Sequence, residues 1–338
     1  MEYRQLGSTG VTISEIGFGC GNTAGLMIWG TRDEQIRVAE RALEAGINYF
    51  DTASSYGEGK SEENLGQVLP HLSARPLIGT KVAFDDKDLR DIPGAIRRSI
   101  ERSLKRLGVD HVDIVHVHNR VCTERTPETR AAHGSMMSVE EMLGPGGIQE
   151  TFQQLQKEGK LRFFGFCAFG GEVPAVQAVI DRGRFHSVLA SYNLLNPSAG
   201  RPAPPNLREA DYGDVITKAS ARGIGVVGLR VIAAGALSGA PTPHELNKGG
   251  SADRRGYDDD ARRALALEDF RLNEDETLAQ VAVRFGLSNP NISTVLVGVS
   301  EMSHVEEAAA CSGRPAFSES DLARLEQLYA TDFGLAVG

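Results

Sequence analysis

Four residues whose side chains can together move a proton to or from an oxygen atom stand near the ends of consecutive predicted strands. Asp51, Lys81 and His118 each end or nearly end a short apolar stretch typical of a β-strand, and Tyr56 stands in the loop after the first stretch. Neighbouring strand ends in a closed barrel lie about 5 Å apart. We therefore expect the four side chains to meet at one point.

The chemistry of this set is proton donation by a phenol. A free tyrosine has a pKa near ~10, which is too high for efficient proton exchange near neutral pH. A nearby ammonium stabilises the phenolate, and a carboxylate keeps a buried lysine charged. We therefore predict that Lys81, held by Asp51, lowers the pKa of Tyr56. His118 would donate a hydrogen bond to a carbonyl oxygen from one fixed tautomer.

Each residue alone also has an ordinary structural explanation, as a turn aspartate, a loop anchor, an exposed strand-end lysine or a core histidine. A metal-dependent hydrolase is a remote alternative, because His116 and His118 lie on the same face of one strand and two histidines can bind zinc. The predicted strands five, six and eight contain no histidine, and the eighth has no carboxylate. We therefore expect no metal and assign His116 to barrel filling.

The elements that position these residues alternate along nearly the whole chain. Eight predicted strands (13–19, 48–53, 76–81, 112–118, 161–167, 187–193, 223–229, 292–298) alternate with amphipathic helical patterns, and a last helix begins near Ser318 or Ser320. This count predicts an α/β fold, a (β/α)8 TIM barrel, forming a single domain over 1–338 and preceded by a β-hairpin that turns near Gly7–Gly10. A doubly wound open sheet is the main alternative, but no GxGxxG follows the first strand and no composition shift marks a second domain.

Three connections are longer than the others: 120–146 after strand four, 197–211 after strand six and 238–269 after strand seven. All three belong to the face where such barrels place their active sites. We expect them to cover a substrate-specific pocket. For the third, which is strongly polar, a surface insertion is an equally good interpretation.

Composition excludes several classes of protein. The formal net charge is 36 − 45 = −9 with no basic block, which argues against a nucleic-acid partner. No stretch approaches the ~18 apolar residues of a membrane helix, and the polar N-terminus has no signal-peptide core. The four cysteines are far apart, with no CxxC pair. We expect a cytoplasmic protein; nothing in the pattern predicts its oligomeric state.

Three motifs resemble the aldo-keto reductase superfamily, in its bacterial aldose dehydrogenase-like branch: "FDTASSYG", "GTK" and "VDIVHVH". The similarity continues through "YNLLNP", residues 235–239 and "VLVGVSEMSHVEEA", so it covers most of the chain. The resemblance implies a (β/α)8 barrel that interconverts carbonyls and alcohols with a nicotinamide cofactor. It also implies that Asp51, Tyr56, Lys81 and His118 form the catalytic tetrad.

The resemblance further implies that the cofactor lies across the barrel mouth, with its pyrophosphate at 229–239 and its adenosine end at 298–308. The implied cofactor contacts are Gly19, Cys20, Cys167, Tyr192, Leu229, Arg230, Gly235, Leu237, Gly298, Ser300, His304 and Glu307. The segment 298–308 contains no Lys or Arg for a 2′-phosphate. This favours NAD or dual use, while His304 keeps NADP open.

The chain departs from the family where the nicotinamide ring and carboxamide would be held. The usual Ser-Asn pair appears as Cys167-Ala168, the usual glutamine as Leu189 and the stacking aromatic as Leu229. Tyr192 and Asn193 are the candidates to take their place.

Substrate contacts are expected from Met27, Trp29 and Asn119. The substrate is expected to be a small carbonyl compound or alcohol: a sugar, a sugar lactol or a small aldehyde, with a sugar-like polyol favoured. A nicotinamide-binding sensor with little turnover, like the potassium-channel β subunits, is the alternative.

Overall fold

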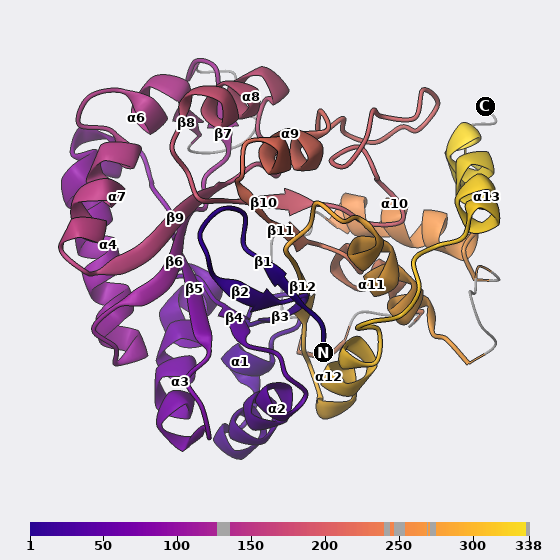
Figure 1. The fold of residues 1–338 in the computed structure, drawn as a ribbon, viewed down its shortest axis with the longest axis horizontal. Helices are drawn as coiled ribbons and strands as arrows, with labels where there is room; N and C mark the ends of the chain where they lie inside the picture. Colours follow the sequence, from indigo (N-terminus) through magenta and orange to yellow (C-terminus); the bar gives the residue numbers. More distant parts are fainter. Residues whose placement is uncertain (127–135, 240–243, 247–253, 269, 271–274, 336–338) are drawn as a thin grey trace.

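Eight parallel strands close into a barrel in the computed structural model, which describes residues 1–126, 136–239, 244–246, 254–268, 270 and 275–335 (Figure 1). In ring order the strands are β3 (Ile16–Gly19), β4 (Tyr49–Asp51), β5 (Leu77–Val82), β6 (Val112–Val117), β9 (Leu161–Cys167), β10 (Ser187–Ser191), β11 (Gly225–Leu229) and β12 (Thr294–Gly298). The predicted barrel is confirmed, and the doubly wound alternative is wrong because β12 pairs with β3 and closes the sheet.

The N-terminal hairpin closes the bottom of the barrel. Its strands β1 (Tyr3–Gln5) and β2 (Thr12–Ser14) pair antiparallel. Leu6 and Ile13 are fully buried in a cluster with residues inside the barrel. The first predicted strand, 13–19, is therefore split: its start belongs to the hairpin, because the chain bends at Glu15, whose carboxylate pairs with Arg4 at 2.7 Å.

Helices surround the barrel (Figure 1). They are α2 (Arg32–Glu44), α3 (Lys60–Val68), α4 (Ile92–Leu107), α7 (Ile148–Lys157), α8 (Val173–Arg182), α9 (Val215–Ala221), α11 (Leu278–Ser288) and α12 (Met302–Ala309). The last helix is α13 (Glu319–Ala330). It begins after Ser318 rather than Ser320, because Ser318 and Asp321 form a capping box.

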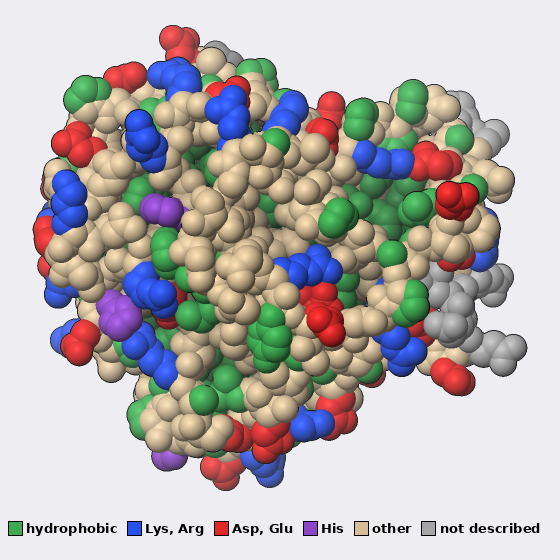
Figure 2. Space-filling view, in the orientation of Figure 1, with side chains coloured by type: hydrophobic (Ala, Val, Ile, Leu, Met, Phe, Trp, Pro, Cys, Tyr) green, Lys and Arg blue, Asp and Glu red, His purple; other side chains and the backbone are tan. Residues whose placement is uncertain are grey.

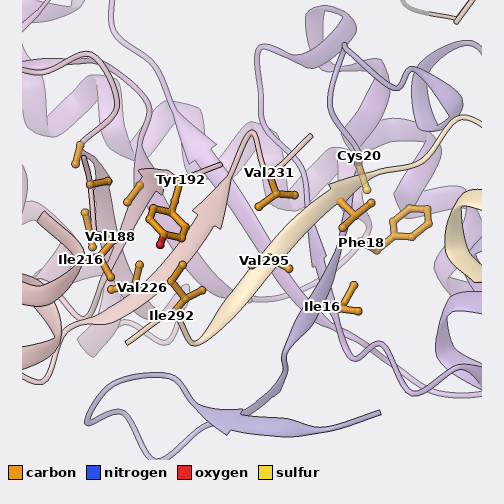
Figure 3. Close-up of a cluster of buried hydrophobic side chains, with 14 of the residues drawn as sticks. Ile16, Phe18, Cys20, Val188, Tyr192, Ile216, Val226, Val231, Ile292 and Val295 are labelled. Carbon is orange, nitrogen blue, oxygen red and sulfur yellow. The ribbon is translucent and has the colours of Figure 1, made fainter. Parts of the chain in front are cut away.

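Alternation along the strands divides the apolar side chains into two cores. Outward-facing residues such as Phe18, Val188 and Val295 pack in the layer between strands and helices (Figure 3). Inward-facing residues such as Tyr49, Ile114 and Leu189 form a separate cluster. The side of the strand therefore decides whether a strand-end residue faces the mouth or the helices.

The long connections contain secondary structure of their own. The loop after β6 forms β7 (Val121–Cys122), β8 (Met137–Ser138) and α6 (Val139–Leu143). The loop after β11 forms the 3-10 segment η4 (Ala233–Ser238) and helix α10 (Arg254–Leu265). The parts of these loops at 127–135, 240–243, 247–253 and 269 lie outside the described residues.

Acidic and basic side chains are interspersed on the face of the molecule shown in Figure 2. In the part of the chain that the structure describes, none of the helices has the length and apolarity needed to span a bilayer.

Candidate active site

Asp51, Tyr56 and Lys81 meet at the C-terminal ends of β4 and β5. Asp51 and Lys81 are each only 2% exposed, and the Lys81 ammonium forms an ion pair with the Asp51 carboxylate. The same Nζ donates to the Thr52 carbonyl at 2.8 Å. It also lies 4.9 Å from the centre of the Tyr56 ring. The lysine thus joins the carboxylate to the phenol.

Burial alone would lower the pKa of Lys81, but the nearby Asp51 carboxylate and the Tyr56 phenol outweigh burial and raise it. Lys81 therefore carries a positive charge at neutral pH. This part of the sequence-based hypothesis agrees with the structure.

The predicted pKa of Tyr56 is wrong in direction. Burial is the largest influence and raises the pKa of the phenol, and the Lys81 charge offsets this only in part. Asp51 and the nearby Cys167 thiol add to the increase. Tyr56 is therefore a protonated phenol in the free protein, in the form of a general acid.

His118 follows β6 and completes the group. Its ring stands edge-on to the Tyr56 ring, with 5.6 Å between centroids. Burial, followed by the charge of Lys81, lowers the pKa of His118 to about 3, so the imidazole is neutral. Nδ1 lies 3.3 Å from the Ser55 hydroxyl. When that hydroxyl donates to Nδ1, the ring proton is on Nε2, which is then a hydrogen-bond donor.

A sharp turn positions Tyr56 above Lys81. Gly57 and Glu58 both have left-handed backbone angles, with φ of 55° and 58°. The Gly57 amide donates to the Asn22 side chain at 3.0 Å. A Cβ at Gly57 would lie 2.5 Å from an Ile28 methyl carbon, so only glycine fits this turn without displacement.

The floor of the mouth on the opposite side is mostly apolar. Cys167, Leu189 and Leu229 belong to the inward-facing cluster. Burial raises the pKa of the Cys167 thiol to about 11, so it is uncharged. Ser191, the last residue of β10, adds a polar side chain to this floor; it is 4% exposed. Ser191 was missed, although it shares the inward face of β10 with Leu189 and period-two alternation predicts it.

Two residues expected to compensate for these departures do not face the mouth. Tyr192 faces outward and stacks on Phe285 of α11 at 4.8 Å, and burial raises its pKa to about 12. The side-chain oxygen Oδ1 of Asn193 accepts hydrogen bonds from the backbone amides of Leu195 and Asn196. Its side-chain NH2 donates to the Arg230 carbonyl. Each side chain already has a partner within the fold, and the contacts of Tyr192 and Asn193 with a cofactor stay predictions.

Several other predicted contacts are also occupied by structural interactions. Met27 is 1% exposed and packs in the outer core, and its predicted substrate contact stays a prediction. Cys20 is buried and faces the outer core (Figure 3), whereas Gly19 is the inward residue at the end of β3. Both amide atoms of Asn119 bond the backbone of Phe84. Trp29 is 40% exposed and lies against the Lys60 ammonium.

The segment predicted to meet the pyrophosphate has an unusual backbone. Arg230, Ala233 and Ala234 have positive φ values of 57°, 46° and 55°, and Gly235 has 103°. Leu237 is fully buried and packs in the outer core. Left-handed conformations of alanine are strained, and such strain is concentrated at functional sites.

Arg230 itself is already partnered. Its guanidinium lies 5.4 Å from the Phe169 ring centre, and Nη2 is 3.4 Å from the Asp260 carboxylate of α10. Burial raises the pKa of Asp260, while the charge of Arg230 acts in the opposite direction.

At the predicted adenosine end, the side chains bind one another. The Ser300 hydroxyl donates to the Ala24 carbonyl at 2.8 Å. His304 Nδ1 accepts the Ser300 amide at 3.2 Å, and its Nε2 lies 3.5 Å from Glu301. Gly298 ends β12 and Glu307 is half-buried on α12. His304 is thus held by the loop as an acceptor.

His116 lies inside the barrel, fully buried, with Nε2 2.9 Å from the Ser187 hydroxyl. Burial holds its pKa well below the usual value. Among the described residues, no three His, Cys, Asp or Glu side chains are grouped as metal ligands.

The family model for the aldo/keto reductase family matches residues 15–330, and this chain belongs to that family. It is an NAD(P)-dependent oxidoreductase of the aldo-keto reductase type. It is 27% identical to L-galactose dehydrogenase of Arabidopsis thaliana over 92% of this chain and 88% of the relative. It is 25% identical to a probable voltage-gated potassium channel subunit beta of Oryza sativa subsp. japonica, over 91% and 90%.

The fold is similar to the holo form of aldo-keto reductase AKR11C1 from Bacillus halodurans. The TM-score is 0.70 at 22% identity, covering 98% of this chain and 97% of that one. This similarity shows that the two chains share a fold.

Proposed function

We propose that this chain interconverts a carbonyl compound and an alcohol, with Tyr56 exchanging the proton at the oxygen atom. A bound nicotinamide supplies or accepts the hydride at carbon. The observation that carries the proposal is the arrangement of the Asp51–Lys81 ion pair beside the Tyr56 ring, 4.9 Å from the Lys81 ammonium.

The side chains have distinct roles in this proposal. Neutral His118 orients the carbonyl oxygen by donating from Nε2. Tyr56 donates its proton as negative charge develops on that oxygen. The Lys81 ammonium stabilises the resulting phenolate, and Asp51 keeps the ammonium in place. In the reverse direction, the phenolate accepts the proton of the alcohol.

The residues of the mouth fit a nicotinamide nucleotide in two respects. The left-handed backbone after β11 supplies amides of the kind that bind phosphate oxygens, and Arg230 adds positive charge beside them. The mostly apolar floor of Cys167, Leu189 and Leu229 fits a nicotinamide ring face. Ser191 is the polar side chain on that floor available to its carboxamide.

We further propose NAD or dual use. Glu301 and Glu307 bring negative charge to the segment after β12, which would repel a 2′-phosphate. His304 Nδ1 already accepts the Ser300 amide and Nε2 lies 3.5 Å from Glu301, so NADP binding would require the ring to reorient.

A sugar-like polyol or its lactol is the proposed substrate. The relative from Arabidopsis is named L-galactose dehydrogenase. The rim also pairs Phe169 and Tyr212, with 6.0 Å between ring centroids, beside the charged Arg230 and Asp260. Aromatic faces beside charged hydrogen-bonding groups suit a polyhydroxylated ligand.

The test is a steady-state screen of NADH and NADPH oxidation with aldehydes, ketones and sugars, together with alcohol oxidation by NAD and NADP. Tyr56→Phe should lower kcat about 10²- to 10⁴-fold with the best substrate, because the proton donor is lost. Tyr3→Phe removes an exposed phenol at the opposite end of the barrel and should leave kcat unchanged. Equal activity of the wild type and Tyr56→Phe would refute the assigned role.

The apolar floor also favours a second candidate, a nicotinamide-binding sensor with little turnover. One relative is named as a channel β subunit. Calorimetry separates the two: tight nucleotide binding without turnover of any screened substrate would favour the sensor.

A further inference from the structure

Tyr49 contacts Asp51, the carboxylate that binds Lys81 in the candidate site. It is the first residue of β4, two positions before Asp51, so both side chains face the barrel interior. Tyr49 is fully buried, and its hydroxyl donates to Asp51 Oδ2 at 2.9 Å. The other carboxylate oxygen, Oδ1, binds Lys81. Each oxygen of Asp51 therefore has a separate donor.

Glycines on both neighbouring strands make room for the Tyr49 ring. A Cβ at Gly17 of β3 would lie 3.0 Å from its Cδ1 atom. A Cβ at Gly79 of β5 would lie 2.2 Å from its hydroxyl oxygen. Because a side chain at Gly79 would occupy the position of the hydroxyl, the barrel is built around this phenol and its bond to Asp51.

We propose that Tyr49 is a positioning residue that sets the acidity of Tyr56 through Asp51 and Lys81. The proposal rests on the proposed role of Tyr56. By donating to Asp51, Tyr49 takes up part of the carboxylate's negative charge. Asp51 then holds Lys81 less strongly, and more of the ammonium charge acts on Tyr56.

Other groups near this chain of contacts do not change charge near neutral pH. Burial and the charge of Lys81 hold the pKa values of His116 and His118 well below neutrality. Burial raises the pKa of the Cys20 and Cys167 thiols. Asp113, another charged group near Tyr49, faces outward and pairs with Arg162.

The test compares Tyr49→Phe with the wild type. Loss of the hydroxyl should move the pH midpoint of alcohol oxidation, where the Tyr56 phenolate is the base, upward by about half a unit to one unit. The matched control is Tyr329→Phe. That change also removes a buried hydroxyl, which donates to the Leu194 carbonyl at 2.9 Å away from the tetrad, and it should not move the midpoint.

A second readout does not depend on turnover. Fluorotyrosine has a more acidic phenol, so incorporating it brings the titration into a pH range where the protein is folded. Fluorine NMR then follows the Tyr56 signal, assigned as the one missing from Tyr56→Phe. It should titrate at higher pH in Tyr49→Phe than in Tyr329→Phe. This readout stands even if no substrate is turned over, an outcome that would count against the proposed function alone.

Gly79→Ala gives an independent route to the same change. The new methyl group should displace the Tyr49 hydroxyl and raise the Tyr56 midpoint. The double variant with Tyr49→Phe should shift the midpoint by less than the sum of the two single changes, since both remove the same hydrogen bond. An unchanged or lower Tyr56 midpoint in Tyr49→Phe would overturn the proposal, as would equal effects of Tyr49→Phe and Tyr329→Phe.

Discussion

Lys81 organises the site at the scale of single residues. Its ammonium binds the Asp51 carboxylate and the Thr52 carbonyl, and it lies 4.9 Å from the centre of the Tyr56 ring. An ammonium held in this way needs no rearrangement when the phenol gives up its proton. Fixed charge of this kind stabilises a transition state more effectively than mobile solvent does.

The protonation states predict a wide pH plateau for carbonyl reduction. Neutral His118 is present above its pKa of about 3 and lost below it. Protonated Tyr56 is present below its raised pKa and lost as the pH rises through that value. We therefore expect kcat/KM for reduction to be flat from about pH 5 to about pH 9. A change in kcat/KM with a midpoint near pH 6.5 would contradict this prediction, because it would show that His118 takes up a proton there.

At the scale of elements, α10 and the end of β11 are linked by an ion pair. Asp260 of α10 neutralises Arg230, the cation proposed to lie beside the cofactor phosphates. The Asp260 carboxylate and the cofactor phosphates would therefore compete for the Arg230 guanidinium.

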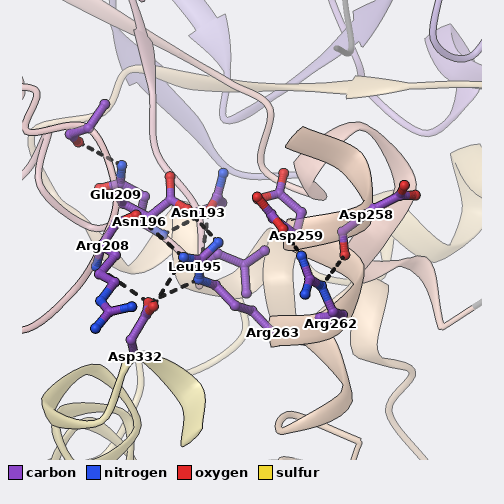
Figure 4. A network of polar contacts seen from close by, with 12 residues as sticks. Asn193, Leu195, Asn196, Arg208, Glu209, Asp258, Asp259, Arg262, Arg263 and Asp332 are labelled. Carbon is purple, nitrogen blue, oxygen red and sulfur yellow. Dashed lines mark hydrogen bonds and ion pairs between the residues drawn. The ribbon is translucent and has the colours of Figure 1, made fainter. Parts of the chain in front are cut away.

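Asp260→Asn should tighten nucleotide binding, because it frees Arg230 and removes a negative charge from the rim. We expect about a two- to fivefold lower Kd for NADH or NADPH by fluorescence titration, less at high salt. Asp259→Asn is the matched control. Asp259→Asn removes the same negative charge one residue earlier in the chain. Asp259 pairs with the exposed Arg262 (Figure 4). Weaker binding by Asp260→Asn would mean that the pair positions Arg230 rather than competing for it.

At the scale of the whole molecule, one buried charge network joins three distant segments. Arg263 of α10 binds Asp332 in η5 (Asp332–Gly334) at 3.0 Å and Glu209 in the loop after β10 at 2.7 Å (Figure 4). The Arg208 amide also donates to Asp332 at 3.4 Å. The two long connections over the mouth are thereby fastened to the C-terminal segment.

Asp332→Ala should destabilise the protein by about 3 kcal/mol, because Arg263 stays buried without its main partner. Urea unfolding followed by circular dichroism measures this change. Glu306→Ala breaks the exposed pair with Arg41 and should cost less than about 1 kcal/mol. If both variants unfold at the same urea concentration, the network does not hold these segments.

Local patterns in the sequence were sufficient to predict the barrel and the convergence of polar side chains at its strand ends. Eight apolar stretches separated by amphipathic helices leave few closed arrangements, and Asp51, Lys81 and His118 stand near strand ends whichever partner packs around them. The same period-two alternation, applied to β10, also predicts that Ser191 faces in and Tyr192 faces out.

Contacts between distant segments had to be seen in the tertiary structure. Whether burial or Lys81 dominates the pKa of Tyr56 depends on how completely the surrounding loops exclude water. Arg230 is paired because α10, thirty residues further along the chain, folds back over it. Such balances depend on distances between groups far apart in sequence, and no local pattern encodes those distances.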